Sequence, residues 1–125
     1  MSGLTAAART MALQYLLTGD ALTRPTEWHV SLHTSGGEAD TGTFASYTRQ
    51  SATFTVAGDR AETDAAVSWS VDAGAAAFTV VAVGIWDAAT GGTQLAELPV
   101  TVNADGGGTI SFSAGNLATL LLDNC

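Results

Sequence analysis

Two histidines, His29 and His33, are the residues of this sequence whose type and spacing most readily suggest chemistry. On a helix, histidines four residues apart share one side and can bind a single metal ion. The surrounding segment EWHVSLHT alternates polar and apolar residues, which predicts a strand. On a strand the two side chains share a face but lie about 13 Å apart, at ~3.3 Å per residue. We therefore expect no metal site, and we assign both histidines to a surface or an interface where their titration could influence assembly.

Acidic residues form two further groups that could bind Ca²⁺ or act as paired catalytic carboxylates. Asp59, Glu62 and Asp64 lie in one polar turn, and Glu38 and Asp40 lie in a glycine-rich loop. Neither group has the D-x-D-x-D-G spacing of a calcium-binding loop. Nothing in the sequence sets the separation that two carboxylates need for glycoside cleavage. Both groups are interpreted as solvated, and we predict neither a metal site nor a cofactor.

The nucleophile that the sequence offers is its single cysteine, Cys125. A thiol becomes reactive where a neighbouring base or charge stabilises the thiolate, so an isolated cysteine at the end of the sequence is interpreted as inert. One cysteine cannot form an internal disulfide, which indicates maturation in a reducing cytosol. The sequence has no G-x-S-x-G, P-loop or G-x-G-x-x-G motif. We therefore expect no catalytic residues and a protein that is not an enzyme.

Charge and length narrow the classes of protein further. The 125 residues suit one domain over residues 1–125, large enough for a core without disulfides. Four arginines, no lysine and twelve acidic residues give a net charge of −8, which disfavours binding to nucleic acid or to an anionic membrane. The sequence has no apolar run long enough to span a membrane and no pattern of a signal peptide. Arg49 is expected either at the surface or in an ion pair with Asp87 or Glu27.

The segment around which a fold must form is 78–86, FTVVAVGIW, followed by a turn at 87–92. It is the one long run that is apolar on both alternating faces. Phe78, Val80 and Trp86 fall on one side, and Val83 and Ile85 fall on the other. A strand that is apolar on both faces is buried on both faces, so this segment is predicted as the central strand of a β domain.

One helix is predicted before the strands, over residues 4–17. The apolar residues that recur at helical spacing are Leu4, Ala8, Met11 and Tyr15. Ser2 or Thr5 can cap the start of this helix, and Gly19 can end it. The helix either plugs one end of the β core, which is the favoured interpretation, or packs on a neighbouring subunit.

Alternation of polar and apolar residues predicts strands from about residue 27 to residue 122. The predicted strands are 27–34, 47–57, 67–71, 78–86, 94–102, 109–113 and 117–122. The alternation predicts that His29, Ser31 and His33 face outward. The side chains predicted to point into the core are Trp28, Val30, Leu32, Ala52, Phe54, Val56, Val67, Trp69, Val71, Ile110 and Phe112. Residues 35–46 are predicted as a loop, 58–64 as a polar turn, and NADGGG at 103–108 as a hairpin turn. Pro99 indicates an edge strand. About seven strands at this spacing predict a mainly β fold, an antiparallel β-sandwich that is jelly-roll-like, with one N-terminal α-helix.

Four segments, taken in order after a short helix, resemble a family of small structural proteins of tailed bacteriophages. The family includes tail-fibre-like and head decoration proteins. The segments are residues 30–34, 47–50, 83–92 and 112–117. The third, VGIWDAATGG, is the most specific, and the resemblance covers nearly the whole chain. It implies a virion part without enzymatic activity, built as a β-sandwich and used in several copies.

On this basis the sequence predicts a virion structural protein, assembled in the host cytoplasm, whose leading assignment is a capsid decoration or cement protein that stabilises the head. The alternative is a tail fibre, tail or baseplate component that binds a receptor or carbohydrate, with Phe44 and Tyr47 as candidate exposed aromatics. For these two rings, burial in the core is the favoured interpretation. Expected partners are copies of the chain itself, as a homotrimer, and the major capsid protein or tail proteins, with neither nucleic acid nor membrane. The expected interface residues are Met11, Tyr15, His29, His33, Glu38, Asp40, Phe44 and Arg49.

Overall fold

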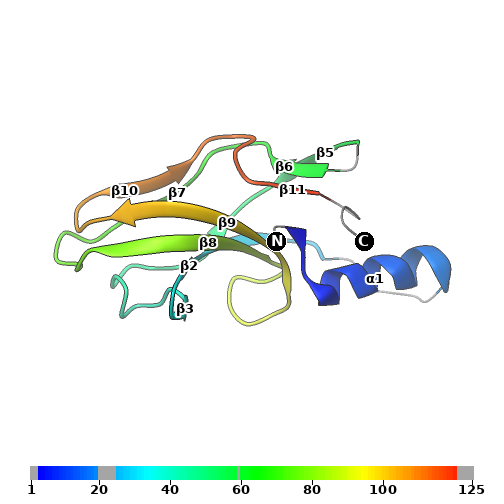
Figure 1. Ribbon diagram of the computed structural model, residues 1–125, viewed down its shortest axis with the longest axis horizontal. Helices are drawn as coiled ribbons and strands as arrows, with labels where there is room; N and C mark the ends of the chain where they lie inside the picture. Colours follow the sequence, from blue (N-terminus) through cyan, green and yellow to red (C-terminus); the bar gives the residue numbers. More distant parts are fainter. Residues whose placement is uncertain (1–2, 20–24, 59, 121–125) are drawn as a thin grey trace.

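The computed structural model describes residues 3–19, 25–58 and 60–120, and in these ranges the protein is mainly β (Figure 1). The elements in chain order are β1 (Gly3–Leu4), α1 (Ala6–Leu17), β2 (His29–Thr34), β3 (Gly37–Glu38), β4 (Gln50–Ser51), β5 (Phe54–Ala57), β6 (Arg60–Thr63), β7 (Val67–Ser70), β8 (Phe78–Trp86), β9 (Gln94–Ala104), β10 (Thr109–Phe112) and β11 (Ala118–Leu120). The strand pairs are antiparallel. The predicted fold class, an antiparallel β-sandwich with an N-terminal helix, is confirmed.

The predicted central strand is β8, which lies between β9 and β2 in a sheet of order β1-β9-β8-β2-β3, with β4 also paired to β2. The regular alternation that the sequence suggested is wrong in one respect. The register of β8 against β9 shifts between Val80 and Ala82. As a result Val80, Val83 and Ile85 are all buried, whereas Val81 is exposed. An irregularity of this kind changes the face to which the following side chains point.

A second layer covers one face of this large sheet. It consists of the pair β7–β10 and the three-stranded sheet β11-β6-β5, which Figure 1 shows on one side of β8 and β9. The side chains predicted to point inward from β7 and β10 are buried. They are Val67, Trp69, Ile110 and Phe112. They pack with Val30, Leu32, Phe44, Val80, Val83, Ile85, Leu98 and Leu117 into one apolar cluster. Each such side chain contributes roughly 1.5–3 kcal/mol by leaving water.

Two turns differ from the prediction. Residues 103–108 do not join two paired strands, because β9 ends in the large sheet and β10 pairs with β7 in the other layer. The turn is bound to the chain after β7, where the Gly107 N–H donates to the carbonyls of Val71 and Asp72. Residues 58–64, predicted as a polar turn, contain the strand β6, which forms a hairpin with β5 around Gly58 at φ +64°. In each case the pairing partner, which local patterning does not specify, decides the outcome.

The predicted strand 47–57 is broken into β4 and β5, and Val56, expected in the core, is 67% exposed. Pro99 behaves as predicted. The strand β1 pairs with β9 only at Ala96 and Glu97, so Pro99 lies on the open part of that edge among the described residues. Of the last predicted strand, residues 118–120 form β11, and residues 121 and 122 lie outside the described residues.

The helix starts two residues later than predicted, because Leu4 pairs with β9 as part of β1. Thr5 is the N-cap, as predicted: its Oγ1 accepts from the Ala8 N–H at 3.3 Å and donates to the Gln94 carbonyl at 2.6 Å. Ser2 lies outside the described residues. Ala8 is the one helical residue that is buried, and Figure 1 shows α1 extending away from the sheets. The favoured interpretation of this helix as a plug for the β core is therefore wrong.

Gly106 tests the turn that joins the two layers. A Cβ at this position would lie 2.6 Å from the carbonyl oxygen of Ala73 and 2.7 Å from that of Ala75. Backbone atoms cannot rotate aside, so we expect Gly106→Ala to lower the free energy of unfolding by about 1–3 kcal/mol in urea denaturation. Gly74→Ala is the matched control, because no atom lies within 4 Å of its Cβ. Equal stabilities of the two variants would contradict this role of the turn.

Candidate functional site

The guanidinium of Arg49 is the centre of a polar cluster on the outer face of the large sheet. Its Nε and Nη2 donate to the two carboxylate oxygens of Glu38 at 2.8 and 2.9 Å. Nη1 donates to the carbonyls of Ala88 and Gly91 at 2.9 and 2.8 Å. Cζ lies 3.8 Å from the ring centroid of Trp86, a cation–π distance. The side chain of Arg49 is only 7% exposed, and these contacts satisfy its charge.

Three separate parts of the chain place these groups. Gly37, at φ +117°, lets β3 fold back on β2 and brings Glu38 over the sheet. The loop after β8 is closed by Asp87, whose Oδ1 accepts from the Thr93 N–H at 2.8 Å. Figure 1 shows β3 and this loop, drawn in yellow, on the side of the sheet opposite to β7 and β10. The predicted ion pair of Arg49 is therefore present with a different partner, because Asp87 closes its own loop.

Tyr47 connects this ion pair to the core. Its hydroxyl donates to Glu38 Oε2 at 3.0 Å and accepts from the Leu32 N–H at 3.2 Å. Burial raises the pKa of Tyr47 far above its ordinary value, so the phenol keeps its proton. The hydrogen bond from Arg49 lowers the pKa of Glu38, against the opposing effect of burial. The carboxylate is thus held in its charged form.

Ser31 and His33 continue the cluster along β2. Trp86 Nε1 donates to Ser31 Oγ at 2.8 Å, and Ser31 Oγ lies 2.7 Å from His33 Nε2. Both residues were predicted to face outward, but Ser31 is fully buried. Gly84 on the neighbouring strand makes room for them, because a Cβ there would lie 2.6 Å from Ser31 Oγ and 2.7 Å from His33 Nε2. The outer face of this sheet is therefore covered by packed polar side chains.

A serine beside a histidine raises the question of nucleophilic catalysis. Ser31 Oγ contacts His33, and the carboxylate of Glu97 raises the pKa of that histidine, although burial has the larger effect and lowers it. A nucleophile must reach a substrate carbonyl. Ser31 has no exposed surface and already accepts the Trp86 N–H. These hydrogen bonds join side chains of β2 and β8, and they leave Ser31 inaccessible to a substrate carbonyl.

Two hollows flank the loop at residues 35–46. One, of about 340 Å³, is lined by Asp40, Thr41, Thr48 and Thr90 above the Arg49 ion pair. The other, of about 470 Å³, is lined by Thr34, Ser35, Thr43, Phe78 and Thr79. The hydroxyl groups on both sides of this loop can donate hydrogen bonds to a polar ligand and accept hydrogen bonds from it.

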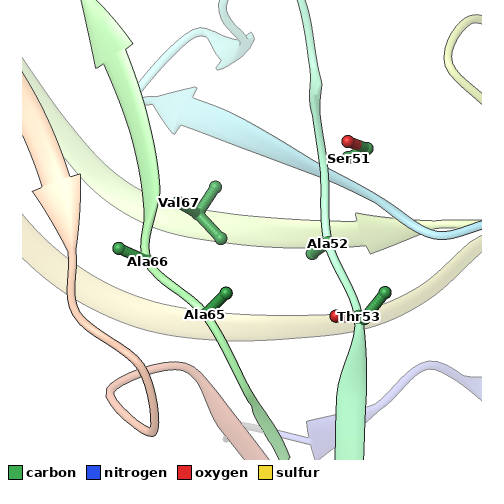
Figure 2. Close-up of a pocket in the computed structure, with 6 residues that line it drawn as sticks. All are labelled: Ser51, Ala52, Thr53, Ala65, Ala66 and Val67. Atoms are coloured by element: carbon green, nitrogen blue, oxygen red, sulfur yellow. The ribbon is translucent and has the colours of Figure 1, made fainter.

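A third hollow, of about 180 Å³, lies between residues 51–53 and 65–67 (Figure 2). The two segments run side by side, and the side chains of Ala65 and Val67 point toward the gap. Its lining consists of small apolar side chains and two hydroxyls, without a charged group. Such a lining has no carboxylate, imidazole or amine that could act as a general acid or base, or activate either hydroxyl as a nucleophile.

The structure brings three of the predicted interface residues together and separates the others. His33, Glu38 and Arg49 share the cluster. His29 lies farther along β2, with Nε2 3.0 Å from Glu27 Oε1. Asp40 closes its own loop by accepting the Gly42 N–H at 2.8 Å. In the described part of the chain, no group of three or more histidine, cysteine or acidic residues could hold a metal ion. Cys125 and Asp59 lie outside that part.

Phe44 and Tyr47, the candidate exposed aromatics, are both buried. Phe44 packs edge-on against Tyr47 and stacks on Phe78 at 5.7 Å between centroids. The favoured interpretation of both rings as core residues is confirmed, and the alternative, that they are available to a receptor, is wrong. Met11 and Tyr15 lie on α1, away from the cluster.

Sequence patterning missed Ser31, Gly84 and Trp86 as members of the cluster. The sequence did contain a signal, because Gly84 is the only glycine in the largely apolar segment 78–86. A glycine inside a strand marks a close approach of other groups. Which groups approach it depends on the pairing of β2 with β8, where Ser31 lies opposite Gly84.

A family model described as "Podophage GP4 fiber I protein gp80" matches residues 3–119 of the chain. The match includes α1, both layers of the sandwich and the whole Arg49 cluster. No curated protein matches the chain. Among the helices of the described residues, none is long and apolar enough to cross a membrane.

Arg49→Lys tests the ion pair. Lysine cannot donate two parallel hydrogen bonds to Glu38 and also reach two carbonyls, so we expect the free energy of unfolding to fall by about 2 kcal/mol. Arg60→Lys is the matched control, because the Arg60–Glu62 pair is exposed and should change stability by no more than ~0.5 kcal/mol. The measurement is urea denaturation, and similar losses in both variants would contradict a special role for Arg49.

The pH dependence of stability tests His33. Burial lowers the pKa of His33 below its ordinary 6.5, although Glu97 and Glu38 oppose this effect. As the pH falls below 6.5, the unfolded chain takes up a proton that folded His33 does not, so stability should decrease between about pH 7 and about pH 5.5. A second decrease should follow below 4.5, where the contribution of Glu38 is lost as its lowered pKa is approached.

In urea denaturation at a series of pH values, His33→Gln should remove the first decrease and leave the second. His29→Gln is the control, and in this variant the decrease in stability that His33 causes should still be present. A wild-type stability that is constant down to about pH 5.5 would contradict the assignment.

Proposed function

Since the chain belongs to the podophage GP4 fibre I protein gp80 family, it is a structural component of the phage virion, and we propose that it is a subunit of a tail fibre. The observation that carries this proposal is the match over residues 3–119, which leaves only a few residues at each end unmatched. We further propose that its partners are other copies of the chain, as a homotrimer, and neighbouring tail proteins.

The geometry supports a role that depends on contacts and does not involve catalysis. Ser31 is buried and accepts the Trp86 N–H, and Arg49 donates to Glu38 and to the carbonyls of Ala88 and Gly91. These bonds hold the loops 35–46 and 87–92 on the sheet. A fibre subunit must keep its outer loops in place while it contacts a host surface, and buried charge-assisted hydrogen bonds serve that purpose.

Receptor or carbohydrate binding by this subunit stays a prediction. Because Phe44 and Tyr47 are buried, such binding would use the hydroxyl-lined hollows beside the loop 35–46. The role of a capsid decoration protein also stays a prediction. The family description names a fibre, which supports the tail assignment.

The number of copies per phage particle distinguishes a tail component from a head component. Quantitative mass spectrometry of purified virions, calibrated against the major capsid protein, should give between a few and about a dozen copies, as small symmetric oligomers on a tail would supply. Antibody labelling in electron micrographs should mark the tail. Copies on the order of hundreds, with labelling over the head, would overturn the fibre assignment and favour decoration of the capsid.

A further inference from the structure

Helix α1 exposes apolar side chains that the other described residues of the chain leave uncovered. Leu13, Tyr15, Leu16 and Leu17 are all exposed, and Leu17 reaches 77%. The contacts of α1 are with β1 and β9, at its N-terminal end, and the rest extends beyond the sandwich (Figure 1). A helix of twelve residues is marginal in water unless its apolar side chains are packed.

The composition of α1 indicates burial on more than one side. Its only polar residues are Arg9, Thr10 and Gln14, so apolar side chains occupy most of its circumference. A helix that is apolar nearly all round is normally surrounded by other protein. Here Ala8 is the one buried residue. The helix therefore has a sequence suited to burial but an exposed position.

A second apolar surface lies at the base of this helix. A hollow of about 300 Å³ is lined by Leu4, Trp28, Phe54, Val56, Ile85 and Leu95, and no charged residue lines it. Val56 forms its rim and is 67% exposed. The hollow lies between the β5–β6 hairpin and the edge formed by β1 and β9.

The helix cannot fill the hollow of its own copy. Leu4 lines the hollow, and α1 begins two residues later at Ala6. At 1.5 Å per residue, Leu17 lies about 16 Å along the helix axis from Ala6. The leucines at the far end are thus carried away from the hollow, whereas the same leucines of another copy can reach it.

The distribution of charge also favours a second copy of the chain as the partner. The chain carries a net charge of −8, so most surfaces of two copies repel each other. Residues 6–17 contain no acidic residue and one arginine, and the hollow has no charged lining. Two copies can therefore approach through these two surfaces with the least electrostatic cost.

We propose that the leucines at the C-terminal end of α1 pack into the apolar hollow of a second copy of this chain. This proposal rests on the self-association included in the proposed function and adds the surfaces that produce it. The helix and the hollow are different patches, so the contact can close as a reciprocal pair or as a ring such as the expected homotrimer.

The test measures the mass of the purified full-length chain by light scattering over a range of concentrations. The wild type should form an oligomer. Leu16→Glu with Leu17→Glu, and separately Val56→Glu, should each raise the dissociation midpoint at least about tenfold, because each places a charge in an apolar contact. Val81→Glu is the matched control: Val81 is an exposed strand valine, at 42%, away from both surfaces. Circular dichroism checks that each variant is folded.

Cross-linking tests whether helix α1 of a second copy occupies the apolar hollow. In a Cys125→Ser background, chains carrying Leu17→Cys and chains carrying Val56→Cys are mixed and oxidised. A disulfide between the two variants requires their Cα atoms to approach within about 7 Å, so its formation supports the proposal.

A wild-type chain that stays monomeric, or an oligomer that neither glutamate variant weakens, would overturn the proposal. A monomer that associates only after removal of residues 121–125 would assign the hollow to the end of the same chain. None of these results decides whether the protein is a fibre subunit, because the copy number and labelling on virions test that separately.

Discussion

The buried charge of Arg49 is the constraint on which the outer half of this molecule depends. A guanidinium that is almost inaccessible to water must be matched by acceptors close by. Glu38 supplies two of them and the loop after β8 supplies two more. These acceptors come from segments far apart in the sequence, so the loops that carry them must lie over Trp86. The ion pair thus determines where two loops sit, whatever its net contribution to stability.

The two faces of the large sheet are buried by different means. The inner face packs on the second layer through apolar side chains such as Val30 and Val80. The outer face is covered by hydrogen-bonded polar groups around Ser31, which a glycine on the adjacent strand accommodates. Nδ1 of His29, farther along β2, is buried without a hydrogen-bond partner among the described residues, but the side chains of Ser31 and Arg49 each have partners. The same saturation removes them from chemistry, which agrees with a structural role in the virion.

The polar groups of Arg49, Glu38 and Ser31 are therefore paired with each other or with neighbouring groups, whereas apolar surface is exposed elsewhere. Helix α1 and the hollow beside β1 are apolar, uncharged or nearly so, and exposed in a single copy. The family description names a podophage fibre protein, and we have proposed that this chain associates with further copies of itself. In such an assembly exposed apolar surfaces are where subunits meet. The distribution of polar and apolar surface is thus consistent with a chain that acts through contacts.

The sequence by itself determined what depends on local patterning. The period of two in residues 67–71 and 109–113 predicted strands with the correct inward side chains, and the apolar segment 78–86 was identified as central because both of its faces are apolar. The family resemblance was also available from sequence, because short motifs in order carry it. The tertiary structure alone decided the partner of Arg49, the burial of Ser31 and the exposure of α1. These features depend on which strands pair and which loops contact each other. Such contacts join residues that are far apart in the chain, and the periodicity of a local segment contains no information about them.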